Sequence, residues 1–236
     1  MTITWADLMA PDLNAAKAFY GGLFRWEFTS TGRYEIATLH GQRMAGIGQI
    51  PAGSKVEPGW IPYFGSEDAE ASAKAIVDAG GTLDRAPTDV GTGVSVLARD
   101  PARARFGVWQ PREGVPERAS LAWCEVNTPD AEAARAFYTG IFGLEAQAME
   151  GLATAYFILH RGDDEIGGIL QMTKAWEGIS PAWTLYFEVD DVNEAAFTVA
   201  ELGGKVEYGP FDSPYGRIAV IRDSQGLFLS LLQRPA

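Results

Sequence analysis

The sequence predicts an α+β protein built from four copies of one βαβββ module. Three observations support this fold class: an internal repeat, the same order of elements in each quarter, and an ordinary globular composition with 47% hydrophobic and 21% charged residues. The clearest repeat pairs residues 11–24, PDLNAAKAFYGGLF, with residues 129–142, PDAEAARAFYTGIF. A second one pairs WIPYF at 60–64 with WTLYF at 183–187. The 236 residues therefore suit two tandem domains of two modules each.

The first quarter of the chain shows the order of elements. A strand is expected over residues 3–9, and a helix follows it with Asp12 as N-cap and apolar residues at helical spacing. Gly21-Gly22 is expected to end this helix. Alternating strands over 33–40 and 42–50 come next, with a tight turn between them.

The other three quarters repeat this order. In the second quarter, a strand over 60–66 precedes a helix over 69–81 that closes on two glycines. Further strands are expected at 82–90, 93–100, 105–110, 119–127, 145–149, 154–160, 165–172, 183–189, 205–211, 216–223 and 227–233. The stretch 111–120 is polar and holds two prolines. We therefore expect one domain over residues 1–113, a linker over 114–118 and a second domain over 119–236.

Charge and cysteine content exclude several classes of function. The net charge of −12, from 31 acidic and 19 basic residues, argues against binding to nucleic acid or to an anionic membrane. The single cysteine, Cys124, excludes an intramolecular disulfide and a CxxC metal site. The sequence has no apolar run near the roughly 20 residues of a membrane span, and its first residues do not read as a secretory signal. We therefore expect a cytoplasmic monomer or homodimer whose partner is a small molecule.

The four modules resemble the glyoxalase, bleomycin-resistance and extradiol-dioxygenase superfamily, also called vicinal oxygen chelate proteins. The resemblance is carried by the two helical repeats and by the closing segments, ARDPARARFGVWQP at 98–111 and IRDSQGLFLSLLQRP at 221–235. The two-domain layout is similar to a group of proteins described as hydroxylases or as 27 kDa antigens. The resemblance implies that each domain forms a cup-shaped, mainly antiparallel sheet.

The resemblance also implies three metal ligands in each domain. Their positions follow by counting seven residues back from the aspartate before each module's helix, and seven on from the aspartate of each closing segment. They are Trp5, Ile61 and Gly107 in the first domain, and Trp123, Thr184 and Ser230 in the second. These residues do not suit a divalent ion, which needs about three imidazole or carboxylate ligands. We therefore expect no metal and no cofactor, which disfavours glyoxalase-type isomerisation and extradiol cleavage.

Residues two positions along a strand face the same way, so the neighbours of these positions would also line the cups. The predicted ligand-binding residues are Trp5, Asp7, Ile61, Tyr63 and Trp109 in the first domain, and Trp123, Glu125, Thr184, Tyr186, Glu188 and Ser230 in the second. Aromatic rings beside carboxylates favour a flat, apolar or cationic small molecule. Alternatively, these aromatic side chains only fill the interior of each domain.

Three functions stay open on the sequence alone. The favoured one is metal-independent binding of a small apolar or aromatic molecule in one or both cups, as in sequestration or resistance. The alternative is an enzyme of the same superfamily, hydroxylase-, oxygenase- or lyase-like, with Glu125, Glu188 and Tyr186 as candidate catalytic residues. A third is a scaffold for protein contacts whose cups are filled.

The histidines and the cysteine are assigned structural roles. His40 and His160 occupy matching strand ends and are expected to serve turns. Cys124 has the opposite strand parity to the predicted cup residues and is expected to be a buried, inert thiol.

Overall fold

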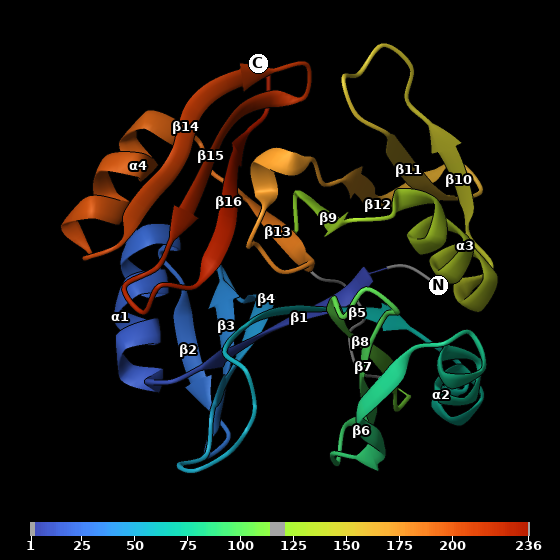
Figure 1. Ribbon diagram of the computed structural model, residues 1–236. Coiled ribbons are helices and arrows are strands. Elements are labelled where there is room, and N and C mark those ends of the chain that lie inside the picture. The colour runs from blue at the N-terminus through green and yellow to red at the C-terminus, as the bar shows by residue number, and fades with distance from the viewer. Residues whose placement is uncertain (1–2, 114–120, 236) are drawn as a thin grey trace. The chain divides into compact units, whose positions relative to one another are not determined.

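The computed structural model describes residues 3–113 and 121–235, and four βαβββ modules follow one another along it (Figure 1). The first module comprises β1 (Ile3–Ala10), α1 (Leu13–Phe24), β2 (Glu27–Ser30), β3 (Tyr34–Leu39) and β4 (Gln42–Gln49). The second comprises β5 (Gly59–Gly65), α2 (Ala69–Asp78), β6 (Thr82–Asp89), β7 (Gly93–Arg99) and β8 (Arg105–Pro111). The third comprises β9 (Trp123–Thr128), α3 (Ala131–Phe142), β10 (Glu145–Ala148), β11 (Tyr156–Arg161) and β12 (Asp164–Gln171), followed by the short helix η1 (Lys174–Trp176). The fourth comprises β13 (Ala182–Glu188), α4 (Val192–Glu201), β14 (Lys205–Ser213), β15 (Gly216–Arg222) and β16 (Phe228–Gln233).

The strands form two eight-stranded mixed sheets, one for each half of the sequence. The strand order is β2-β3-β4-β1-β5-β8-β7-β6 in the first sheet and β10-β11-β12-β9-β13-β16-β15-β14 in the second. Within each module the first strand runs parallel to the last, whereas the later strands pair antiparallel. The predicted α+β class and the tandem modules are thus confirmed.

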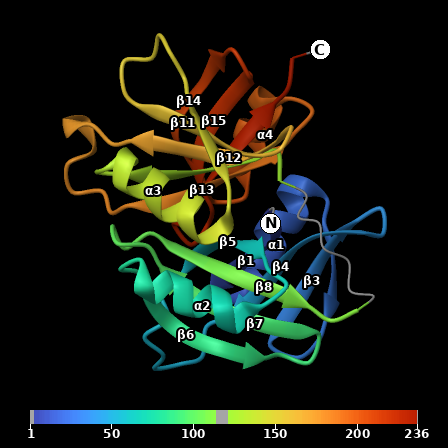
Figure 2. The same cartoon turned by 90° about the vertical axis from the view of Figure 1, so that its right-hand side faces the viewer.

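Packing groups the modules differently from the sheets. One compact unit, here unit 1, takes its described residues from Met1–Trp5, Ile61–Arg118 and Cys124–Trp183. The other, unit 2, takes them from Ala6–Trp60, Ala119–Trp123 and Thr184–Ala236. In unit 1, α2 lies beside α3, and in unit 2, α1 lies beside α4 (Figures 1 and 2). The domain division at 113 and 119 stays a prediction, and the linker 114–118 lies outside the described residues.

A buried tyrosine joins the two modules of unit 2. The Tyr20 hydroxyl of α1 donates to Asp223 Oδ2 at 2.9 Å and accepts from Trp60 Nε1 at 3.1 Å. Tyr20 is fully buried, and burial together with the nearby Asp223 carboxylate raises its pKa well above the usual range. The hydroxyl therefore keeps its proton and remains a donor. The Phe187 ring completes the cluster, with its centroid 4.9 Å from that of Trp60.

Unit 1 repeats the same arrangement with equivalent residues. The Tyr138 hydroxyl of α3 donates to Asp100 Oδ2 at 3.0 Å and accepts from Trp183 Nε1 at 2.9 Å. Phe64 of β5 stacks on Phe142 of α3, with 4.3 Å between ring centroids. The repeated FY motif and the aspartate of each closing segment thus hold a helix of one module to a strand end of another.

One helix end differs from the sequence prediction. Asp12 caps α1 as expected, but the helix continues through Gly21-Gly22 to Phe24, and Arg25 adopts a left-handed backbone with φ 57°. A Cβ on Gly22 would lie 2.8 Å from Leu202 Cδ2, at the end of α4. The prediction was wrong because this glycine permits close helix packing instead of ending the helix. None of the described helices is both long and apolar enough to cross a membrane.

Candidate functional site

Two of the strands that carry predicted site residues, β5 and β13, show one face packed against helices. Phe64 of β5 stacks on α3, and Phe187 of β13 lies 5.3 Å from the Phe24 ring of α1. Because side chains alternate along a strand, the intervening residues point to the opposite side, which we call the far face. Strand alternation places the predicted residues of β5 and β13 on far faces. Those of β1, β8, β9 and β16 are assigned to far faces in the same way, because they alternate with the buried residues Ala6, Phe106, Cys124 and Leu231. Unit 1 holds Trp5, Ile61, Tyr63, Trp109 and Glu125, and unit 2 holds Asp7, Trp123, Thr184, Tyr186, Glu188 and Ser230.

Aromatic rings cover glycines on the far face of the second module. A Cβ on Gly107 would clash with the Tyr63 ring, and one on Gly93 would lie 2.7 Å from the Trp109 ring. Tyr63 and Gly107 are cross-strand partners on β5 and β8, which brings the ring over the glycine. Tyr63 is buried, whereas Trp109 is half-buried. The tyrosine ring thus occupies the space that a longer side chain at position 107 would need.

A carboxylate is hydrogen-bonded to a tyrosine on the far faces of the first and third modules. In unit 1 the Tyr156 hydroxyl donates to Glu125 Oε2 at 3.0 Å. In unit 2 the Tyr34 hydroxyl donates to Asp7 Oδ1 at 2.7 Å. The Tyr156 ring covers Gly168, and the Tyr34 ring covers Gly46. These two tyrosines complete the polar part of the candidate site.

Neither tyrosine was among the residues predicted from the sequence, although a signal existed. The segments RYEIATLH at 33–40 and TAYFILH at 154–160 place a tyrosine at matching positions, three residues before a buried apolar residue, Ala37 or Leu159. Each of these strands pairs with a glycine-bearing neighbour, and that neighbour pairs with the strand that carries the carboxylate. A small glycine between two larger side chains lets them reach each other.

The far face of the fourth module is more mixed. Thr184 and Tyr186 are half-buried, and Ser230, the cross-strand partner of Tyr186, is fully buried. The Ser230 hydroxyl has no hydrogen-bond partner among the described residues. Glu188 ends β13 with a side chain 57% exposed, and its Oε2 lies 3.2 Å from Arg234 Nε. Glu188 is therefore a solvent-exposed, ion-paired carboxylate.

The residues at the family's metal positions do not fit a divalent ion. Ile61 is fully buried and apolar, Gly107 has no side chain, and Ser230 offers a single hydroxyl. Within residues 3–113 and 121–235, no three His, Cys, Asp or Glu side chains gather as a metal site would require. This donor chemistry differs from what the sequence resemblance implies for metal-dependent members.

Cys124 and His40 have the environments expected from the sequence. Cys124 is 2% exposed, and its burial raises the pKa of the thiol far above the usual range. His40 lies in the turn between β3 and β4 with φ 52°, next to Gly41 at φ 78°. The thiol is therefore neutral and inaccessible, and His40 serves a turn.

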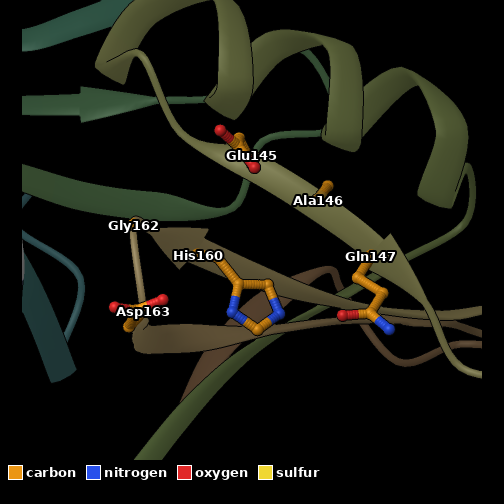
Figure 3. A pocket seen from close by; sticks show the side chains of 6 residues that line it. All are labelled: Glu145, Ala146, Gln147, His160, Gly162 and Asp163. Atoms are coloured by element: carbon orange, nitrogen blue, oxygen red, sulfur yellow. The ribbon is translucent and has the colours of Figure 1, made fainter.

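His160 instead lies within β11 and lines a pocket in unit 1 (Figure 3). The pocket has a volume of about 360 Å³ and is lined by Glu145, Ala146, Gln147, His160, Gly162 and Asp163. In Figure 3 the imidazole lies between Asp163 and Gln147. Its Nε2 is buried without a hydrogen-bond partner in the described structure. The expected turn role of His160 was wrong because β11 continues to Arg161, so the turn to β12 begins only at Gly162.

The sequence has relatives across nearly its whole length. A model of the Glyoxalase/Bleomycin resistance protein/Dioxygenase superfamily matches residues 2–108 and 120–231. The chain is 35% identical to "Putative glyoxylase CFP32" of Mycobacterium bovis, over 98% of this chain and 94% of that protein. It is 34% identical to "Anthracycline biosynthesis protein DnrV" of Streptomyces peucetius, over 97% of this chain and 92% of that protein.

Solved structures share the fold at much lower identity. The Mn(II)-bound glyoxalase from Novosphingobium aromaticivorans aligns with a TM-score of 0.68 and 16% identity, covering 98% of this chain and 81% of that chain. A homoprotocatechuate 2,3-dioxygenase from B. fuscum aligns with a TM-score of 0.68 and 14% identity, covering 100% and 72%. At these identities the likeness concerns the fold alone.

Proposed function

Since the chain belongs to the glyoxalase/bleomycin resistance protein/dioxygenase superfamily, we propose that it binds a small, flat aromatic molecule without a metal, in the predicted cup of one or both domains. The observation that carries this proposal is the set of aromatic residues at and beside the family's metal positions. Trp5, Trp109, Trp123 and Tyr186 are all half-buried residues. Aromatic residues that are not fully buried favour a ligand that stacks on their rings.

The names of two relatives support an aromatic ligand. Both are called anthracycline biosynthesis proteins, and anthracyclines are polycyclic aromatic compounds. The far-face carboxylates, Asp7 and Glu125, add a preference for ligands that carry hydroxyl or amino groups. A protein that holds such a molecule without transforming it would act by sequestration, as in resistance.

One observation favours an enzyme as the second candidate. Glu125 is 8% exposed and accepts a hydrogen bond from Tyr156 at 3.0 Å. A buried carboxylate beside a phenol can take a proton from a bound substrate or return it. A relative named as a glyoxylase is consistent with chemistry in this family. Tyr186 and Glu188, both in unit 2, remain predicted catalytic residues.

Binding is tested by titrating the protein with an anthracycline aglycone and following ligand fluorescence, with and without EDTA. We expect Trp5→Ala or Trp123→Ala to lose about 1–3 kcal/mol of binding free energy, depending on which cup is used. Trp176→Ala is the matched control, because Trp176 lies in η1 and is half-buried outside the predicted cups. Equal losses in all three variants would refute aromatic binding at the far faces, and loss of binding in EDTA would refute metal independence.

The enzyme alternative is tested in the same samples by chromatography of the ligand after incubation. A binder returns the ligand unchanged. An enzyme converts it, and Glu125→Gln then lowers kcat while the dissociation constant changes little. Turnover that survives Glu125→Gln would remove Glu125 from the chemistry.

A further inference from the structure

A second cavity, of about 240 Å³, lies within unit 1 at the start of α3. One wall is the turn between β7 and β8, residues 100–102, and the other is the segment 128–134 that enters α3. The cavity is distinct from the far faces, because Asp100 lies on the helix-packed side with Tyr138. Neither the sequence resemblance nor the proposed function assigns it a role.

The internal repeat shows which group this cavity lacks. Asp100 and Asp223 are equivalent, since each accepts a tyrosine hydroxyl and also the backbone N–H of the residue four positions later. Two residues further along stand Ala102 in unit 1 and Gln225 in unit 2. The Gln225 carboxamide binds the backbone before α1: its Oε1 accepts from Asp12 N at 2.7 Å, and its Nε2 donates to Asp12 O at 3.0 Å.

In unit 1 the equivalent N–H and carbonyl belong to Asp130, and the side chain that binds them makes weaker hydrogen bonds. Thr128 Oγ1 accepts from Asp130 N at 3.4 Å and donates to Asp130 O at 3.5 Å, close to the limit of a hydrogen bond. Ala102 has no side-chain carboxamide that could form these hydrogen bonds. The space that the Gln225 side chain fills in unit 2 is therefore left as a cavity in unit 1. This cavity lies beside the Asp130 N–H and carbonyl, which are the donor and acceptor that a carboxamide would bind.

We propose that this cavity binds the primary carboxamide of a ligand, held at Asp130 as Gln225 is held at Asp12. The ligand oxygen would accept from the Asp130 N–H, and its NH₂ would donate to the Asp130 carbonyl. Pro101, Pro129 and the alanines of α3 line the rest of the cavity, so an apolar or aromatic body would fit behind the amide. A carboxylate lacks the hydrogen for the carbonyl and would lie near the Asp130 side chain, so acids would be excluded.

The test uses benzamide as probe and benzoate as its isosteric control, with backbone amide shifts of residues 128–134 followed by NMR. We expect saturable shifts with benzamide and none with benzoate. Ala102→Gln supplies the missing side chain and should weaken benzamide binding by at least about tenfold. A short peptide with one glutamine flanked by glycines is the second probe. If the peptide binds more tightly than benzamide, the natural ligand is a protein side chain. If it binds more weakly than benzamide, the natural ligand is a small molecule.

The reverse variant guards against a failure of Ala102→Gln to fold. Gln225→Ala empties the equivalent place in unit 2, and it should add a second set of benzamide-dependent shifts around Asp12. Unchanged benzamide binding in Ala102→Gln, or equal shifts from benzoate, would overturn the proposal. So would the absence of shifts in the wild-type protein up to the solubility limit of benzamide.

Discussion

Replacing Tyr138 by Phe removes one oxygen atom from the interior of unit 1 and keeps the ring. The lost hydroxyl donates to Asp100 Oδ2 at 3.0 Å and accepts from Trp183 Nε1 at 2.9 Å. Asp100 is 1% exposed and Trp183 is 5% exposed, so both groups are buried. Asp100 Oδ1 keeps the Ala104 N–H at 2.8 Å, which limits the damage to one carboxylate oxygen and one indole N–H.

The magnitude follows from these two losses. A hydrogen bond to a charged group contributes about 1.5–3 kcal/mol, and a buried donor without an acceptor costs about 1–3 kcal/mol. Because the two effects share one hydroxyl and are not additive, we expect the free energy of unfolding to fall by about 3 kcal/mol at neutral pH.

The loss should depend on pH in a definite direction. Burial raises the pKa of Asp100, and the Tyr138 hydroxyl opposes that rise by stabilising the ionised carboxylate. Removing the hydroxyl therefore raises the pKa further and costs more where Asp100 is ionised. The difference in stability between wild type and Tyr138→Phe should be largest at neutral pH and shrink as the pH falls toward the ordinary aspartate value of 3.8.

Urea unfolding, followed by tryptophan fluorescence and circular dichroism, measures the effect. Tyr20→Phe is a matched variant, since its hydroxyl joins Asp223 and Trp60 in unit 2, and it should lose a similar amount. Tyr208→Phe is the control, because Tyr208 is 66% exposed. If Tyr138→Phe loses no more stability than Tyr208→Phe, the hydroxyl does not hold unit 1 together and the reasoning fails.

Three further predictions test other parts of the molecule. Gly107→Ala should lower the free energy of unfolding by about 1–3 kcal/mol, because its Cβ would clash with the Tyr63 ring; Gly140→Ala, which meets open space in α3, should not be destabilising in the same urea assay. Gln225→Ala should cost about 1–2 kcal/mol in urea unfolding, since it leaves the backbone at the start of α1 without its carboxamide partner. Cys124 should not react with Ellman's reagent until urea unfolds the protein, and rapid reaction in native buffer would contradict its burial.

The order of modules could be predicted because the evidence for it is local and repeated. Asp12 caps α1 through the backbone N–H groups two and three residues later, a contact that short-range sequence encodes. The end of α1 could not be predicted in this way. Gly21-Gly22 has the composition of a helix stop, but Gly22 packs against Leu202, a residue distant in the sequence.

In the candidate site, too, local features could be predicted from the sequence and long-range contacts could not. Strand alternation alone assigns Asp7 and Glu125 to far faces, so the sequence could identify them. Their bonds to Tyr34 and Tyr156 depend on register across an intervening strand, which no single segment reveals. The cavity at the start of α3 was harder still to predict, because it exists where unit 1 has Ala102 in place of a longer side chain.

The repeat separates what the fold requires from what a ligand would require. The tyrosine, aspartate and tryptophan that join modules recur in both units with nearly the same hydrogen bonds. The same three side chains therefore hold the modules together in each unit. The differences lie elsewhere: Asp7 corresponds to Glu125, and Gln225 to Ala102. Each exchange changes the reach or presence of a polar group without altering the frame around it. These two differences lie at positions suited to recognition, so under the proposals above we expect the two halves to differ in what they bind.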